Sequence, residues 1–86
     1  MSNIYKQLIE KYGEKQVVKA IEELSELEKE LCKALIGKAD QEHIAEEIAD
    51  VYIMLEQMML YFNIDLNKII KIINLKLERT KERLLK

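Results

Sequence analysis

The sequence has no proline and no tryptophan, and only two of its 86 residues are glycine, Gly13 and Gly37. Proline and glycine interrupt helices more than any other residues, so their scarcity favours long helices. Cys32 is the only cysteine, which excludes an intramolecular disulfide and a zinc site built from four thiolates. We therefore expect a nearly all-helical chain and a cytoplasmic location.

Long apolar runs and an excess of one charge are also missing. No window approaches the run of about 20 apolar residues that a membrane helix needs, and the first residues lack the apolar stretch of a signal peptide. The 14 basic and 16 acidic side chains leave a net charge of -2. This balance provides neither the basic surface of a nucleic-acid-binding protein nor an acidic tail. We expect no membrane partner and no nucleic-acid partner, so any function depends on where individual charges lie.

Leucine, isoleucine, glutamate and lysine dominate, and most of these are good helix formers. With the two glycines and residues 63–65 as breaks, the sequence predicts helices near 2–12, 14–36, 41–62 and 66–85. Asp40 and Asp65 precede apolar-periodic runs and are suited to cap helix starts. We expect one domain over residues 1–86, an all-α four-helix bundle in which the short first helix lies across three long antiparallel helices.

Apolar residues recur at helical spacing, mostly every three or four positions, along the three long predicted helices, with one longer gap in the last. The predicted core stripes are Val17, Ile21, Leu24, Leu27, Leu31 and Leu35; Ile44, Ile48, Val51, Leu55, Met59 and Phe62; and Leu66, Ile69, Ile70, Ile73, Leu77 and Leu84. A chain of this length buries only about 60–65% of its unfolded surface, so its core is small. Ile72 and its neighbours exceed one stripe on the last helix. We therefore expect a homodimer or homotetramer in which the last helix takes part.

Two acidic pairs stand at helical spacing on the second and third predicted helices. Glu23 and Glu26 form an ExxE pattern, and Glu47 and Asp50 form an ExxD pattern after a gap of 20 residues. Residues three apart on a helix are neighbours, so each pair can point at one spot. Glu47 also lies close to the apolar stripe that contains Val51. A carboxylate near an apolar interface is costly unless it is paired, and converging carboxylates repel one another.

A hard divalent cation would remove both costs. Mg²⁺ prefers oxygen ligands and keeps positions for water and substrate phosphates, which suits a site made only of aspartate and glutamate. The four carboxylates therefore favour phosphate-ester or phosphoanhydride chemistry. The alternative is that glutamates at this spacing form only a solvated helix face, since 13 residues of the chain are glutamate.

The order of these motifs resembles that of the MazG-like all-α nucleoside triphosphate pyrophosphatases, which include MazG, the dimeric dUTPases, dCTP pyrophosphatases and phosphoribosyl-ATP pyrophosphohydrolase. The family signature EExxE followed by ExxD is matched by residues 22–26 and 47–50. Residues 63–66 are Asn-Ile-Asp-Leu, similar to the Gly-Ile-Asp-Leu of many members, and residues 76–83 resemble the family's KxxxNxxR. The similarity covers residues 14–84.

This resemblance implies hydrolysis of a nucleoside triphosphate, or its deoxy form, to the monophosphate and pyrophosphate, as in housecleaning of the nucleotide pool. It implies Mg²⁺ as the cofactor, with Mn²⁺ as an alternative. The implied metal ligands are Glu23, Glu26, Glu47 and Asp50, and the implied phosphate contacts are Lys19, Lys76 and Arg83. Glu22 and Glu46 are candidate general bases, because each adjoins an implied metal ligand in the sequence.

Two further polar side chains accompany the acidic pairs. His43 precedes Glu47 by one helical turn, where some members of the family carry a phosphate-binding lysine, and we expect the two to pair at the surface. Gln16 shares a helix face with Lys19 and Glu23. We expect Gln16 to be a surface residue, with a place in the lining of a pocket as the alternative.

Departures from the family pattern leave the nucleobase open. Thr80 stands where the family usually has asparagine, and no tryptophan is present to stack on a base. Tyr52-Ile53-Met54 replaces the Tyr-His pair common in phosphoribosyl-ATP pyrophosphohydrolases, so an enzyme of that kind is less favoured. The sequence also allows a helical oligomerisation or interaction module without catalysis, and a family member that binds nucleotide or metal without hydrolysis.

Overall fold

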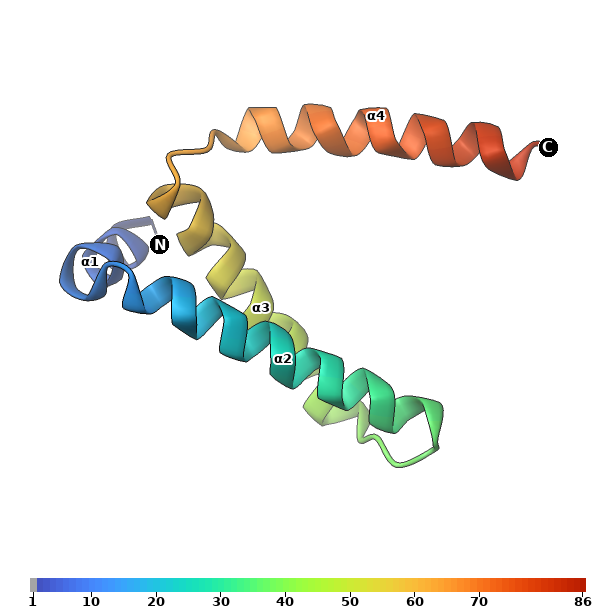
Figure 1. The fold of residues 1–86 in the computed structure, drawn as a ribbon, viewed down its shortest axis with the longest axis horizontal. Coiled ribbons are helices and arrows are strands. Elements are labelled where there is room, and N and C mark those ends of the chain that lie inside the picture. The colour runs from blue at the N-terminus through green and yellow to red at the C-terminus, as the bar shows by residue number, and fades with distance from the viewer. Residues whose placement is uncertain (1) are drawn as a thin grey trace.

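The computed structural model describes residues 2–86, which form four α-helices and no strand. The helices are α1 (Ser2–Tyr12), α2 (Lys15–Leu35), α3 (Gln41–Tyr61) and α4 (Leu66–Leu84) (Figure 1). Their ends lie within one residue of the predicted ends, so the prediction of an all-helical chain is confirmed. Over the same residues, no helix has both the length and the apolar character needed to cross a bilayer.

The helices end at residues that tolerate a left-handed backbone. Gly13, Gly37 and Asn63 have φ angles of +52°, +71° and +55°. Glycine adopts this conformation without a steric penalty, and asparagine is one of the few other residues that adopts it readily. These three positions therefore separate the four helices.

Aspartate side chains start the third and fourth helices. Oδ1 of Asp40 accepts a hydrogen bond of 3.0 Å from the backbone N–H of Glu42, and Oδ1 of Asp65 accepts one of 3.1 Å from that of Asn67. Each bond satisfies a backbone donor that has no partner within the helix. Both predicted caps are confirmed.

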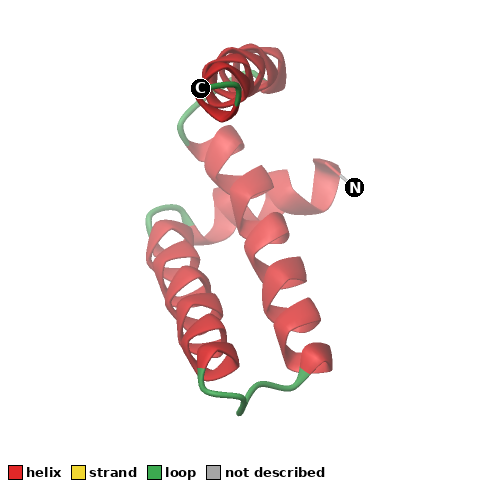
Figure 2. Ribbon diagram, turned by 90° about the vertical axis from the view of Figure 1, so that its right-hand side faces the viewer, coloured by secondary structure: helices red, strands yellow, loops and turns green. Residues whose placement is uncertain are grey.

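α2 and α3 form an antiparallel hairpin, and α1 crosses one end of it (Figure 2). The buried apolar side chains among the described residues are Ala20 of α2 and Val51 and Met54 of α3. Two polar side chains, Glu30 and Gln57, are buried with them. Such a small core leaves the stability of the chain dependent on a few side chains, as expected for a short domain.

α4 extends away from the hairpin (Figure 1), and none of residues 66–84 is buried. The prediction that three long helices pack together is therefore confirmed for α2 and α3 and is wrong for α4 within one chain. The physical reason is the turn at residues 62–65, which contains the left-handed Asn63 and directs α4 away from its own hairpin. Among the described residues, Ile69 at the start of α4 is half-buried and faces apolar side chains of α3, whereas the rest of the apolar stripe of α4 is exposed.

The predicted apolar stripes of the hairpin are only partly covered. On α3, Val51 is buried, whereas Ile48 and Leu55 are 41% and 48% exposed. The inner face of α3 is instead centred on Met54 and Gln57, which are both buried. This orientation of α3 turns Glu47 and Asp50 toward α2 and leaves part of the apolar stripe exposed.

Candidate metal centre

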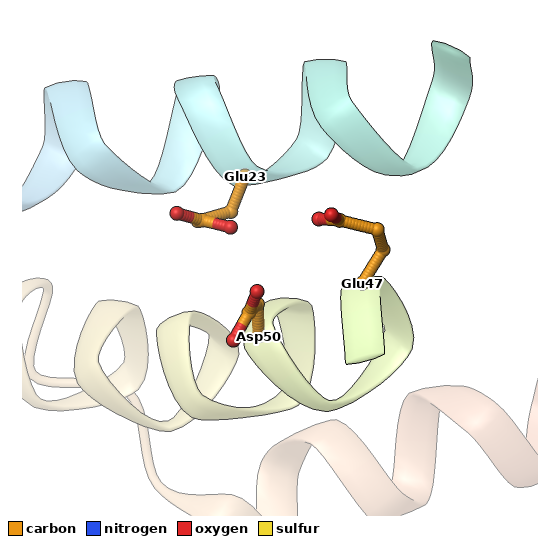
Figure 3. A group of neighbouring side chains, drawn as sticks. All are labelled: Glu23, Glu47 and Asp50. Atoms are coloured by element: carbon orange, nitrogen blue, oxygen red, sulfur yellow. The ribbon is translucent and has the colours of Figure 1, made fainter. Parts of the chain in front are cut away.

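Three of the four predicted carboxylates meet between α2 and α3. Figure 3 shows Glu23 of α2 pointing toward Glu47 and Asp50 of α3. One oxygen of each side chain lies within 4.8 Å of an oxygen of the other two, and all three residues are half-buried. A Mg²⁺ ion with ligands at about 2.1 Å needs oxygens about 3–4 Å apart. A shift of about 1 Å in these flexible side chains would therefore bring the three oxygens to that spacing.

Glu26, the fourth predicted ligand, lies at the edge of this group. It is one helical turn from Glu23, but its side chain is exposed and is not among the three that converge. Its negative charge still acts on the group, because it contributes to raising the pKa of Glu47. The structure thus brings three of the four carboxylates together and leaves Glu26 beside them.

Glu47 has the least satisfied side chain of the group. Its Oε2 atom is buried and has no hydrogen-bond partner among the described residues. Loss of solvent raises the pKa of this carboxyl, and nearby carboxylates raise it further, in decreasing order Asp50, Glu26, Glu23 and Glu30. Buried polar atoms in native proteins are nearly always paired, so this oxygen is free to accept from a bound water or to bind a cation.

Glu30, a further acidic residue of α2, was not predicted to take part. It is 7% exposed, and its Oε1 lies 3.5 Å from Nζ of Lys33 and 3.6 Å from Nδ1 of His43. His43 therefore pairs with Glu30, and the predicted pairing with Glu47 was wrong. The antiparallel hairpin is the cause, because it sets the first turn of α3 against the last turns of α2. Glu30 follows Glu23 by two helical turns, and this spacing was the available signal.

The predicted phosphate-binding residues fall into two places. Lys19 borders the carboxylates, with its Nζ 3.4 Å from Oε1 of Glu23. Lys76 and Arg83 lie on α4, away from the hairpin of their own chain (Figure 1). The structure therefore brings one of these three cations to the acidic group.

Three of the six basic residues of α4 gather on one face of that helix. Lys76, Arg79, Thr80 and Arg83 line a shallow hollow of about 260 Å³. The hydroxyl of Thr80 donates a hydrogen bond of 2.9 Å to the backbone oxygen of Lys76, within the helix. Lys76 and Arg83 thus share a face, as their spacing of seven residues predicts.

The candidate bases Glu22 and Glu46 are both exposed, and neither belongs to the converging group. Each directly precedes a member of that group, and successive residues of a helix point about 100° apart. Their position next to the carboxylates in sequence therefore does not place them at the meeting point of Glu23, Glu47 and Asp50.

A cavity of about 330 Å³ opens beside the carboxylates, where α1, α2 and α3 meet. Its lining residues are Leu8, Tyr12, Gln16, Lys19, Glu23, Asp50, Ile53, Met54 and Gln57. Most of the accessible surface of its walls is apolar, and its charged groups come from Lys19, Glu23 and Asp50. Mostly apolar walls with a few polar groups are typical of a small-molecule site. Gln16 was predicted as a lining residue only in the alternative interpretation, and Gln57 was not predicted.

A scan against models of known protein families, a search of curated proteins and a search of solved structures each gave no match to this chain. The evidence for a function is therefore the geometry of Glu23, Glu47 and Asp50, the cavity beside them and the motifs of the sequence.

Proposed function

We propose that this protein is a Mg²⁺-dependent pyrophosphohydrolase of the MazG-like kind, which cleaves a nucleoside triphosphate to the monophosphate and pyrophosphate. The observation that carries the proposal is the convergence of Glu23, Glu47 and Asp50 from two helices, next to a cavity of ligand size. The order and spacing of the acidic motifs along the sequence support the same activity.

The donor set suits a hard divalent cation. Carboxylates supply only oxygen ligands, which Mg²⁺ prefers, and a cation would provide the partner that Oε2 of Glu47 lacks. Glu23, Glu47 and Asp50 would hold the ion, and we include Glu26 as a fourth ligand because it belongs to the acidic motif and lies one helical turn from Glu23. When bound, Mg²⁺ would supply neutralisation of the negative charge that the phosphates carry as water attacks.

Lys19 has a defined part in this proposal. Its ammonium pairs with Glu23 at 3.4 Å, and both residues line the cavity. Once Glu23 serves as a metal ligand, Lys19 can turn its charge to a phosphate oxygen at the cavity wall. A charge-assisted hydrogen bond of this kind both binds and orients the triphosphate.

α3 and α4 carry opposite charge and both leave apolar side chains exposed, which fits a second copy of the chain. α4 contains six basic and two acidic residues, whereas α3 contains five acidic residues and no lysine or arginine. Both helices also expose apolar side chains, among them Ile48, Leu55, Ile70 and Ile73. We therefore propose a homodimer or homotetramer in which α4 of one copy covers α3 of another. Lys76 and Arg83 of that α4 would then approach the partner's carboxylates.

A panel of the nucleoside and deoxynucleoside triphosphates tests the activity. In the presence of Mg²⁺, at least one substrate is expected to yield its monophosphate and pyrophosphate in equal amounts, because cleavage falls between the α and β phosphates. The two products are quantified by ion-exchange chromatography, which also separates orthophosphate. Chelation of Mg²⁺ should stop the reaction, and Mn²⁺ should restore it.

The same panel distinguishes the competing functions. Release of orthophosphate would indicate cleavage at the terminal phosphate and would contradict the proposed reaction. Absence of product from every substrate at micromolar enzyme would leave a protein that binds nucleotide or metal without hydrolysis, or an interaction module. Titration with Mg²⁺ and with the same nucleotides separates these two, because only the first should bind either ligand.

Ile73→Glu on α4 tests the proposed contact between copies. Ile73 is 47% exposed in the single chain, so the substitution should leave the helix folded. A buried glutamate at an apolar contact is costly, so the oligomer is expected to dissociate to monomers in light scattering at micromolar concentration. Asn74→Glu is the matched control, because it adds the same charge to the next exposed residue and should leave the oligomer intact. A wild-type chain that is monomeric under these conditions would contradict the proposed contact.

A further inference from the structure

A buried pair of amides links the two helices that carry the carboxylates. Gln57 of α3 is 1% exposed, and its Oε1 accepts a hydrogen bond of 2.7 Å from Nε2 of Gln16 of α2. A buried amide that loses its partner costs free energy, because it cannot exchange that partner for water. Any movement that separates the two glutamines is therefore disfavoured.

The pair stands at a fixed offset from the carboxylates. Gln16 precedes Glu23 by seven residues, and Gln57 follows Asp50 by seven. Seven residues are about two helical turns, or about 10 Å. Because α2 and α3 run antiparallel (Figure 2), a contact between the two glutamines sets Glu23 opposite Asp50 further along the hairpin. Figure 3 shows these two carboxylates pointing toward each other.

A second polar pair repeats the offset on the other side of the carboxylates. Glu30 follows Glu23 by seven residues, and His43 precedes Asp50 by seven. Oε1 of the buried Glu30 lies 3.6 Å from Nδ1 of His43. Polar side chains at repeated positions of a helix interface can fix the register of the helices. The two pairs on either side of the carboxylates select the same register.

Burial of apolar surface alone would favour another orientation of the hairpin. Ile21 and Leu24 of α2 and Ile48 and Leu55 of α3 are all exposed. Turning these side chains toward one another would remove more apolar surface from water. It would also turn Glu23 away from α3, because successive residues of a helix point about 100° apart. The observed orientation therefore needs a contact that opposes this rotation.

We propose that Gln16 and Gln57 are positioning residues, which fix the rotation and register of α2 against α3 and thereby hold Glu23 opposite Asp50. Rotation or sliding of either helix would break the hydrogen bond of the buried amide. The inference rests on the proposed function only for the identity of the bound ion, Mg²⁺.

Distances between spin labels test the register without metal or substrate. One nitroxide is attached to the exposed Cys32 of α2 and another to Glu56→Cys, at an exposed position of α3. Double electron–electron resonance on the full chain, diluted with unlabelled chain, should give one narrow distance within the chain. In Gln16→Leu/Gln57→Leu this distance is expected to shift or broaden by roughly 5 Å, the rise of one helical turn.

Mg²⁺ affinity and stability should respond differently in the same leucine variant. Titration calorimetry is expected to show at least about tenfold weaker binding of Mg²⁺, as is typical when residues that orient metal ligands are changed. Urea unfolding of the metal-free protein should show no loss of stability, because both partners of a polar pair become apolar side chains of similar size. A purely structural role predicts the reverse, a less stable protein whose folded form binds Mg²⁺ normally.

Two further variants complete the test. Gln16→Lys/Gln57→Glu restores a polar link of similar length between the helices, so it should recover the wild-type label distance and most of the Mg²⁺ affinity. Gln7→Leu/Gln41→Leu makes the same two changes at exposed positions and should behave like the wild type. If the leucine variant of the buried pair does not fold, as judged by circular dichroism, Gln16→Leu alone replaces it, with the same expected shift and loss.

The outcomes separate this inference from the proposed function. A folded leucine variant that keeps the wild-type label distance, or one that shifts and still binds Mg²⁺ like the wild type, would overturn the positioning role. A register that depends on the glutamines, in a protein that hydrolyses no nucleotide, would support the positioning role and contradict the proposed hydrolysis. Turnover by a protein whose register ignores the glutamines would do the reverse.

Discussion

Glu47→Gln is expected to lower Mg²⁺-dependent turnover by more than about 100-fold and to make the metal-free protein more stable above the raised pKa of Glu47. Turnover falls because the variant removes one of the three converging carboxylates. Stability rises because glutamine keeps the shape of the side chain and removes a charge that lies among other carboxylates, with Oε2 buried and unpaired. Opposite effects on activity and stability are typical of a functional residue that destabilises its own fold.

The pH dependence of the stability effect has a defined sign. Burial and the neighbouring carboxylates raise the pKa of Glu47 in the folded chain. In the unfolded chain the pKa of a glutamate is about 4.3. Below that value Glu47 is protonated in both states, so the wild type and the variant should be equally stable. As pH rises through the raised pKa of the folded state, ionisation increasingly penalises the folded wild type. Urea unfolding of the two metal-free proteins across this range measures the difference.

Glu28→Gln is the control for this experiment, since it removes the same charge from an exposed position of α2. It should change neither turnover nor the pH dependence of unfolding. Wild-type turnover in Glu47→Gln would show that Glu47 is not a ligand and would favour the interaction module. Lower stability of metal-free Glu47→Gln above the raised pKa would contradict the unpaired state of the carboxylate.

Met54→Ala is expected to reduce the free energy of unfolding by about 2–5 kcal/mol. Met54 is 5% exposed and is one of three buried apolar side chains among the described residues, so its loss leaves a cavity in a small core. The variant also removes the thioether that contacts Nε2 of the buried Gln57. Natural domains are stable by only about 5–15 kcal/mol, so this loss is a large part of the total free energy of unfolding. Urea unfolding followed by circular dichroism measures the change.

Leu60→Ala on the same helix provides the comparison, because Leu60 is 46% exposed. Its cost should be less than about 1 kcal/mol. Equal losses in the two variants would place the core of the protein elsewhere than around Met54.

The helices could be predicted from the sequence because their signals are local. Gly13, Gly37 and Asn63 break the chain where only a left-handed backbone fits, and Asp40 and Asp65 cap the helices that follow. Such features involve neighbouring residues, so no knowledge of the tertiary packing is needed to recognise them.

Packing could be predicted only in part, because periodicity identifies an apolar face without naming the surface that covers it. Ile48 and Leu55 belong to the predicted core stripe and are exposed, whereas Gln57, which breaks the stripe, is buried. Which face of α3 is buried depends on its packing against α1 and α2. The same packing buries Glu30 of α2. Tertiary contacts of this kind override the sequence pattern.

The candidate site shows the same division. Spacing along the helices selected four carboxylates, of which Glu23, Glu47 and Asp50 converge. Spacing did not separate Glu26, which is exposed, from Glu23, which is half-buried. Which of two residues one turn apart faces the partner helix depends on how the two helices are rotated against each other. It also could not show that His43 lies opposite Glu30, since that depends on the register of the hairpin.

The position of α4, which extends away from its own hairpin (Figure 1), would make activity depend on protein concentration. If α4 of one copy completes the site of another, the active form exists only as an association product, and its share of all chains follows mass action. Activity per molecule would then rise with the amount of protein present, until the site is saturated with partner helices. The expression level would then regulate activity, because the protein would be mostly monomeric and inactive at low concentration and mostly assembled and active at high concentration.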